Sequence, residues 1–170
     1  MTRIGAIRMV DVTRADFDET ASEYDFRELT KQPRLKVLQC SAPVPDGTWR
    51  LVNEVFCAAR PDVELRVYGH YSTECDLTFV RQLTNVRRFA ADCLMSAIGV
   101  EAIAEISDLE SLSLGIFELK DFSVLDRVSS RLTTLGLGAT RSKKPGLAPL
   151  SRFRSLRSFT LRATVRTSMS

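Results

Sequence analysis

The sequence is poor in the residues that build metal and thiol sites. It has one histidine, His70, and four cysteines, none of which forms a Cys-x-x-Cys pair. Structural zinc sites need Cys or His ligands at short spacing, so we predict no metal site. The cysteines are expected to be reduced and mostly buried, where a thiol behaves as a small apolar group.

Long apolar runs and sorting signals are also missing. No stretch approaches the roughly 20 apolar residues that a membrane-spanning helix needs. Arg3 and Arg8 interrupt the apolar stretch at the N-terminus, which makes it too broken for a signal peptide. We therefore expect a cytoplasmic protein without a membrane partner.

Motifs for catalysis and for cofactors are absent as well. Neither a dinucleotide-binding glycine fingerprint nor a phosphate-binding P-loop occurs. Cys75 follows His70 by five residues, but an activated nucleophile also needs a third group that orients the base. A turn histidine beside a buried cysteine is the simpler interpretation. We predict no catalytic residue, no cofactor and a chain that is not an enzyme.

Acidic residues are missing from one part of the chain only. The whole chain has 24 Lys and Arg and 21 Asp and Glu, but from Arg127 onward it has ten basic and no acidic residues. Such asymmetry favours an anionic partner, or it marks only the basic end of an elongated molecule.

The sequence does contain an internal repeat, which shows as apolar residues that recur every 23 residues. One unit holds Val80, Leu83, Val86, Phe89 and Ala91, and the next holds Ile103, Ile106, Leu109, Leu112 and Leu114. The end of the pattern returns at Leu132, Leu135 and Leu137, and after 24 residues at Leu156, Phe159 and Leu161. Earlier units hold Leu65 and Val67, and Leu35, Leu38 and Cys40, with an irregular unit at Ile7 and Met9. The spacing changes from three to two within each unit, which predicts a helical segment followed by one short strand.

These residues resemble the L-x-x-L-x-L pattern of the leucine-rich-repeat family, over about residues 33–163. The resemblance implies an α/β repeat solenoid: an arc with a parallel β-sheet on its concave face and short helices or 3-10 turns on its convex face. The family's usual Asn or Cys after each strand is replaced here by Pro43, Leu94, Phe117, Thr140 and Thr164. The turns must therefore satisfy their backbone groups in another way.

The convex segments differ along the chain. Residues 48–60 are predicted to form an amphipathic helix that Thr48 caps and Pro61 ends. Phe26 and Leu29 indicate a short helix before Pro33, and residues 119–128 indicate a short helix or 3-10 turns. We divide the chain into an N-terminal cap or irregular first repeat at 1–32, an array of about five units at 33–163 and a tail at 164–170.

Residues between the strand leucines should point away from the core, because side chains alternate along a strand. The family resemblance implies that this concave face binds partners, and Arg and aromatic side chains dominate the energetics of many interfaces. We therefore predict partner binding by Arg66, Tyr68, Arg87, Arg88 and Arg157. The alternative interpretation is that these are solvated strand residues. The rest of the face is a strip of small polar residues that would admit a closely packed partner.

The function predicted from the sequence is that of a protein-binding module or scaffold. The alternative is a binder of nucleic acid or another polyanion at the basic C-terminal end, which needs a basic footprint but lacks exposed aromatics for stacking. The pattern also ends without an evident cap. An unpatterned tail, an end-to-end homodimer or truncation of a longer array would each account for this, and we favour the last two.

Overall fold

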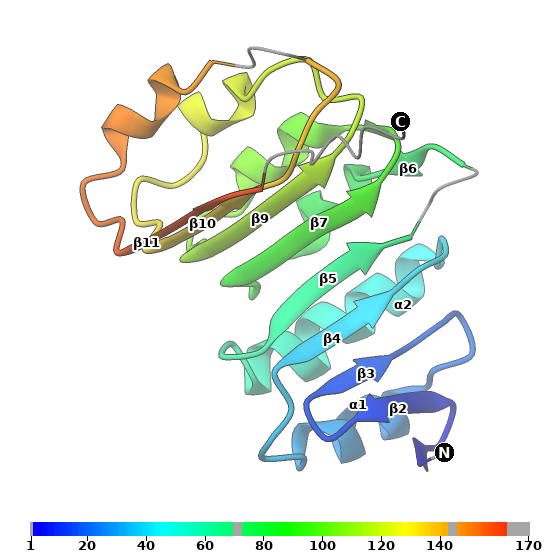
Figure 1. The fold of residues 1–170 in the computed structure, drawn as a ribbon. Helices are drawn as coiled ribbons and strands as arrows, with labels where there is room; N and C mark the ends of the chain where they lie inside the picture. Colours follow the sequence, from blue (N-terminus) through cyan, green and yellow to red (C-terminus); the bar gives the residue numbers. More distant parts are fainter. Residues whose placement is uncertain (1, 70–72, 143–145, 163–170) are drawn as a thin grey trace, which may run out of the picture.

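The structure is a computed structural model that describes residues 2–69, 73–142 and 146–162. Within them, one sheet has the strand order β1-β2-β3-β4-β5-β7-β9-β10-β11, and β6 pairs with β8 in a second, two-stranded sheet. Every pairing of the large sheet from β3 onward is parallel. The helices cover one face of this sheet (Figure 1). The predicted repeat solenoid is thereby confirmed.

The strands are short, as one strand per repeat requires. They are β1 (Arg3–Ile4), β2 (Ile7–Asp11), β3 (Arg14–Asp16), β4 (Val37–Cys40), β5 (Glu64–Tyr68), β6 (Cys75–Asp76), β7 (Arg88–Leu94), β8 (Ala97–Ile98), β9 (Ser111–Ile116), β10 (Thr134–Leu137) and β11 (Ser158–Leu161). The helices are α1 (Glu23–Thr30), α2 (Asp46–Leu51), the π-helix η1 (Val52–Cys57), and the 3-10 helices η2 (Thr78–Gln82), η3 (Val100–Glu105), η4 (Ser123–Asp126) and η5 (Ala148–Arg152).

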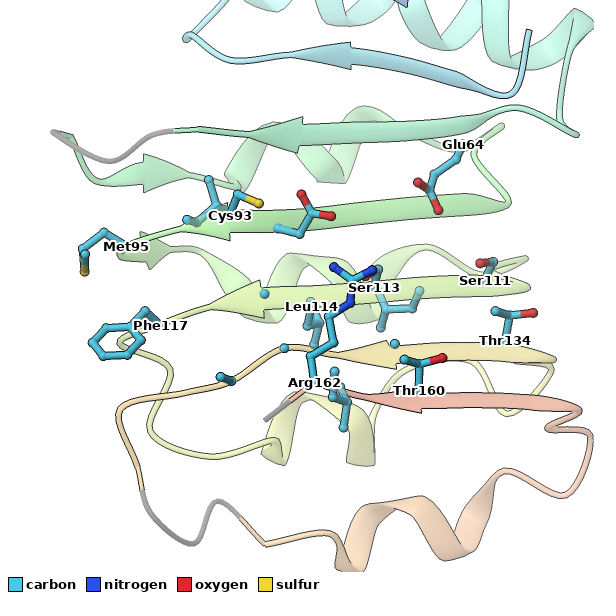
Figure 2. A pocket seen from close by; sticks show the side chains of 18 residues that line it. Glu64, Cys93, Met95, Ser111, Ser113, Leu114, Phe117, Thr134, Thr160 and Arg162 are labelled. Atoms are coloured by element: carbon cyan, nitrogen blue, oxygen red, sulfur yellow. The ribbon is translucent and has the colours of Figure 1, made fainter. Parts of the chain in front are cut away.

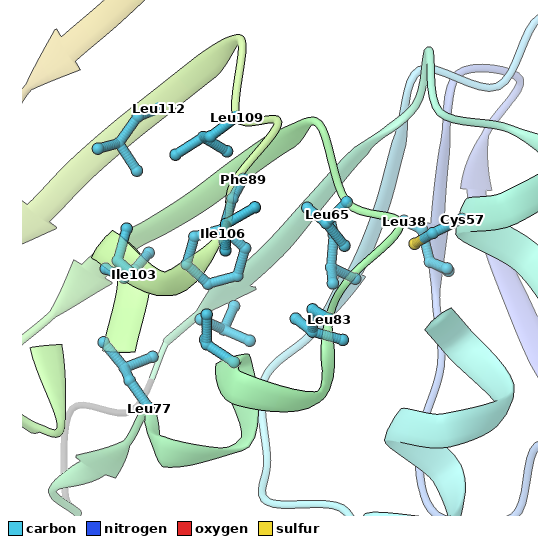
Figure 3. Close-up of a cluster of buried hydrophobic side chains, with 14 of the residues drawn as sticks. Leu38, Cys57, Leu65, Leu77, Leu83, Phe89, Ile103, Ile106, Leu109 and Leu112 are labelled. Atoms are coloured by element: carbon cyan, nitrogen blue, oxygen red, sulfur yellow. The ribbon is translucent and has the colours of Figure 1, made fainter. Parts of the chain in front are cut away.

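The strand registers align the repeats side by side. One row of paired residues crosses the sheet through Ala15, Leu38, Leu65, Phe89, Leu112, Leu135 and Phe159. All of them except Phe159 are at most 1% exposed. Figure 3 shows Phe89 within the buried cluster to which Leu65, Leu83, Ile106 and Leu112 also belong. Each unit therefore buries its apolar face only against its neighbours, as expected for a solenoid.

The N-terminal end differs from the sequence prediction. Ile7 and Met9 lie on β2, which is antiparallel to both β1 and β3, so the irregular unit predicted there is wrong. The first parallel strand is β3, where Ala15 pairs with Leu38 at a spacing of 23 residues. A small alanine followed by Asp16 hid this unit from a search for leucines. The boundaries at residues 32 and 163 stay predictions.

The first two convex segments are longer helices, as predicted. Helix α1 begins at a capping box in which Ser22 and Asp25 satisfy each other's backbone N–H groups. The second helix begins after Pro45, not at Thr48, so the predicted cap is wrong, and the helix continues from α2 into the π-helix η1. Trp49 is buried on this helix, and its ring stacks on Phe79 at a centroid distance of 3.8 Å.

Two arginines, Arg60 and Arg152, bind backbone carbonyl groups of the preceding unit. The Arg60 guanidinium donates to the carbonyl oxygens of Gln32 at 2.7 Å and Leu35 at 3.2 Å. Arg152 does the same near the C-terminal end of the array, at 2.7 Å from the Leu125 oxygen and 2.5 Å from the Val128 oxygen. Carbonyls at the ends of short convex helices lack intrahelical donors, so these arginines stabilise the stacking of the units.

Three aspartates satisfy backbone groups in the turns that lead from the strands to the convex helices. The carboxylates of Asp18, Asp76 and Asp121 each accept a backbone N–H two residues later, at 2.8–2.9 Å. These hydrogen bonds lower the pKa of each carboxyl group below its usual value. The turns are thus satisfied one at a time, which fits the irregular spacing of the repeats.

Candidate functional site

Arg66 lies at the centre of a hydrogen-bonded network on the face of the sheet opposite the helices. Its guanidinium donates to Asp92 Oδ1 at 2.7 Å and to Gln39 Oε1 at 2.8 Å. It also lies over the ring of Tyr68, 4.5 Å from the centroid. Two of the predicted partner-binding residues, Arg66 and Tyr68, are therefore brought together.

Asp16 extends the network toward the N-terminal end. Its carboxylate accepts hydrogen bonds from Gln39 Nε2 at 2.6 Å and from the Tyr68 hydroxyl at 3.2 Å, and it pairs with the Arg8 guanidinium. The network thus spans β2, β3, β4, β5 and β7. The Arg66 side chain is only 18% exposed and its guanidinium is held by partners within the chain. Arg66 is therefore a rigid part of this surface.

Within the described residues, no hydrogen bond joins the other three predicted residues to the network of Arg66. Arg87 precedes β7 and forms an exposed ion pair with Glu110, with 3.3 Å between Nη1 and Oε1. Arg88 begins β7 and is half-buried, and Arg157 is exposed just before β11. Exposed ion pairs of this kind contribute little to stability. Arg88 nevertheless lies close enough to Glu64 to lower the pKa of its carboxyl group, as Arg66 also does.

A groove of about 490 Å³ lies beside the network, over β7, β9, β10 and β11. Its floor consists of small residues that alternate with the core leucines: Ser111, Ser113 and Gly115 of β9, Thr134 and Gly136 of β10, and Gly138 beyond it. Figure 2 shows Ser113 and Thr134 facing the groove and Arg162 reaching across it. The strip of small polar residues predicted from the sequence is thus the floor of a groove.

Gly115 and Gly138 lie at one end of the groove floor, where the absence of a side chain deepens the groove. A Cβ at Gly115 would lie 3.0 Å from the Asp92 Cβ, and one at Gly138 would lie 2.8 Å from the Gly115 Cα. Neither position has room for a side chain without movement of the backbone. The depth of the groove therefore depends on these glycines.

Sequence analysis missed the rim of the groove. Met95 and Phe117 are 40% and 38% exposed and line the groove together with Cys93, which has a left-handed φ of 53°. Met95 and Phe117 follow strands at places where a solvated turn would normally carry polar residues. Apolar residues directly after a strand were therefore the signal in the sequence that could have identified this rim. Exposed apolar residues beside a groove are typical of binding surfaces.

Charges of opposite sign border the groove. Glu64 and Asp92 line it from β5 and β7, and Arg162 lines it from the end of β11. Burial raises the pKa of the Glu64 carboxyl, and the nearby Asp92 carboxylate raises it further, against the opposing effect of Arg88. A cation beside this carboxyl group would lower its pKa again.

The raised pKa of Glu64 makes a prediction for stability. Its ionised form is disfavoured by folding, so ionisation destabilises the protein once the pH rises above the normal value of 4.5. Glu64→Gln should therefore increase the free energy of unfolding at pH 7, and this gain should disappear as the pH falls below 4.5. Denaturant titrations at pH 7 and pH 4 measure it, and a loss of stability at pH 7 would contradict the account.

The four cysteines, all free, divide into three buried thiols and one exposed thiol. Burial raises the pKa of Cys57 to about 12 and that of Cys75 to about 11, and raises the pKa of Cys40 as well. Buried thiols of this kind are inert, so Cys75 has no activated thiolate. His70, considered as its partner, lies outside the described residues.

Native thiol labelling tests this division. A disulfide reagent should modify one thiol per folded chain quickly, and Cys93→Ser should abolish that phase, because only the exposed Cys93 is accessible. Unfolding should release the other three thiols. Fast labelling that persists in Cys93→Ser would show that the core around Cys40, Cys57 or Cys75 is open.

Metal ligands and membrane helices were sought in the same parts of the chain. Among the described residues, no group of three or more His, Cys, Asp or Glu side chains could hold a metal ion. In these ranges no helix has the length and apolar character that a membrane crossing requires.

No protein-family model and no curated protein matches the chain. Among solved structures, an internalin of Listeria monocytogenes is similar over 86% of this chain and 44% of its own, with 15% sequence identity and a TM-score of 0.44. The chain therefore spans less than half of the length of that internalin.

Proposed function

We propose that the chain is a non-catalytic protein-binding module that holds an extended segment of a partner in the concave groove. The observation that carries the proposal is the groove itself: a floor of small residues between acidic and basic walls, with exposed Met95 and Phe117 at one end. Small floor residues let a partner backbone come close, and Met and Phe provide apolar anchor points.

The network beside the groove supports the same proposal. Arg66 contacts Asp92 and Cys93, which both line the groove, so Arg66 and Tyr68 fix one wall. A wall held by internal hydrogen bonds needs no ordering when the partner binds, which reduces the entropic cost of association. In this proposal Arg66 and Tyr68 are positioning residues at the border of the groove.

Selection from a displayed peptide library tests the proposal. Peptides enriched on the wild-type chain should bind Ser113→Arg more weakly by about tenfold or more, because an arginine at the centre of the floor fills the space that the peptide occupies. Ser151→Arg, with the same change on the exposed convex helix η5, is the matched control and should bind normally. Equal binding to both variants would place the site elsewhere.

A polyanion site at the basic end is the second candidate. Arg154, Arg157 and Arg162 are exposed there, but Arg152 is occupied by two backbone carbonyls. Phosphate-driven binding falls steeply with salt. Absence of binding to random duplex DNA at low salt would eliminate this candidate.

A further inference from the structure

Among the described residues, β11 is the outermost strand of the sheet and leaves apolar side chains exposed at its edge. It is the last strand in the order of the sheet, and Figure 1 shows it at one end of the array. Phe159 and Leu161 continue the register of Leu135 and Leu137, which are 1% exposed, yet Phe159 and Leu161 are 42% and 52% exposed. The last two members of the apolar rows thus lie against solvent.

The backbone of β11 also offers unused hydrogen-bonding groups. Ser158 and Arg162 donate their backbone N–H groups to the carbonyls of Thr133 and Leu137 on the β10 side. Because backbone groups alternate in direction along a parallel strand, Phe159 and Leu161 direct their N–H and C=O groups to the opposite side. Within the described residues no strand pairs with β11 on that side, so Phe159 and Leu161 present donors and acceptors to a further strand.

Charge specifies what kind of strand would fit. Arg157 lies two residues before Phe159, and Arg87 occupies the equivalent position two residues before Phe89. Arg87 forms an ion pair with Glu110, which is the equivalent residue of the next unit. Arg157 would meet the equivalent residue of an added strand. Since the chain has no acidic residue after Asp126, the edge lies in a cationic region that attracts a carboxylate.

We propose that the edge of β11 binds an extended, acidic segment of a partner protein as an additional parallel strand. The segment has a Glu or Asp that pairs with Arg157, followed after one residue by an apolar-x-apolar pair that covers Phe159 and Leu161. Main-chain hydrogen bonds and alternate apolar side chains are the general basis of such strand addition. A second copy fits less well, because two such edges would bring Arg157 and Arg162 of both copies together.

A peptide with the sequence of residues 107–117 is a suitable probe, because it contains Glu110, Leu112 and Leu114 in the required spacing. Its saturable binding to the full chain can be followed by fluorescence anisotropy of a labelled copy. Arg157→Glu should weaken binding by about tenfold or more, because it places like charges opposite each other. The same peptide with Glu110→Arg should recover binding to that variant, which a merely destabilised protein would not show.

Two further variants separate the edge from other sites. Leu161→Pro removes an outward N–H that β10 does not use and should abolish peptide binding. Ser113→Arg, which blocks the groove, should leave binding of the peptide to the β11 edge unchanged. Failure of the edge proposal and failure of the groove proposal are therefore distinguishable. Binding that survives Leu161→Pro, no saturable binding, or a stable dimer in which Phe159 is protected would each overturn the proposal.

Discussion

Phe89→Ala should lower the free energy of unfolding by about 3–5 kcal/mol, the usual cost of removing a fully buried phenylalanine. Phe89 is 0% exposed and pairs with Leu65 on one side and Leu112 on the other. Its loss leaves a cavity between three units that cannot collapse, since the hydrogen bonds of β5, β7 and β9 fix their separation. Chemical denaturation followed by circular dichroism measures the change.

Phe159→Ala is the matched control, because Phe159 is also a phenylalanine and occupies the equivalent register position three strands further along the sheet. Phe159 is 42% exposed, and its replacement should cost less than about 1 kcal/mol. A large loss at Phe89 with a small loss at Phe159 supports the repeat register and the open end. Equal losses would mean that Phe159 is covered in solution.

Asn53→Ala should lower the free energy of unfolding by about 2 kcal/mol, because it removes two hydrogen bonds that a buried side chain makes. Asn53 is 5% exposed and lies on the π-helix η1. Its side chain donates to Thr84 Oγ1 at 3.1 Å and accepts the Asn85 backbone N–H at 2.8 Å, while its own carbonyl accepts from Asn85 Nδ2 at 3.3 Å. These bonds hold the helix to the turn that leads into β7.

Thr84→Ala provides the control for this prediction. It removes only one partner of Asn53 and should cost about 1 kcal/mol. The double variant Asn53→Ala and Thr84→Ala should then be more stable than the sum of the single changes predicts, because the two side chains share one hydrogen bond. Strict additivity would show that this contact contributes nothing to stability.

The repeat was predictable because its physical cause is local and periodic. Each unit must bury an apolar row against its neighbours, so Leu65, Phe89, Leu112 and Leu135 recur at nearly constant spacing. The change from threefold to twofold spacing was enough to place helices and strands. The same pattern placed Phe159 at a core position, but it could not show that this position lies at an edge.

The parts that sequence analysis missed depend on contacts between units or on small residues. Ala15 forms the first core position of the array, but an alanine does not stand out as an apolar signal. The inter-unit role of Asn53 requires Thr84 and Asn85, about 30 residues away, and therefore leaves no local pattern. The continuation of α2 as a π-helix likewise has no signature in the spacing of its apolar residues.

The candidate site was predicted in part for the same reasons. Strand alternation placed Arg66 and Tyr68 on the correct face, but it could not show that Asp16, Gln39 and Asp92 occupy the hydrogen-bonding groups of Arg66 and Tyr68. Alternation also puts Gln39, Ala90 and Ser111 on this face, yet they are only 3%, 0% and 3% exposed, so position along a strand does not predict exposure.

Cys93 offers the most direct test of binding in the groove, because this exposed thiol lines it. The rate at which a thiol reagent modifies Cys93 should fall by about tenfold when a peptide selected on the wild-type chain saturates the protein. As a control, a cysteine introduced as Ser151→Cys in a Cys93→Ser background should react at the same rate with and without peptide. Unchanged modification of Cys93 under a saturating peptide would contradict binding in the concave groove.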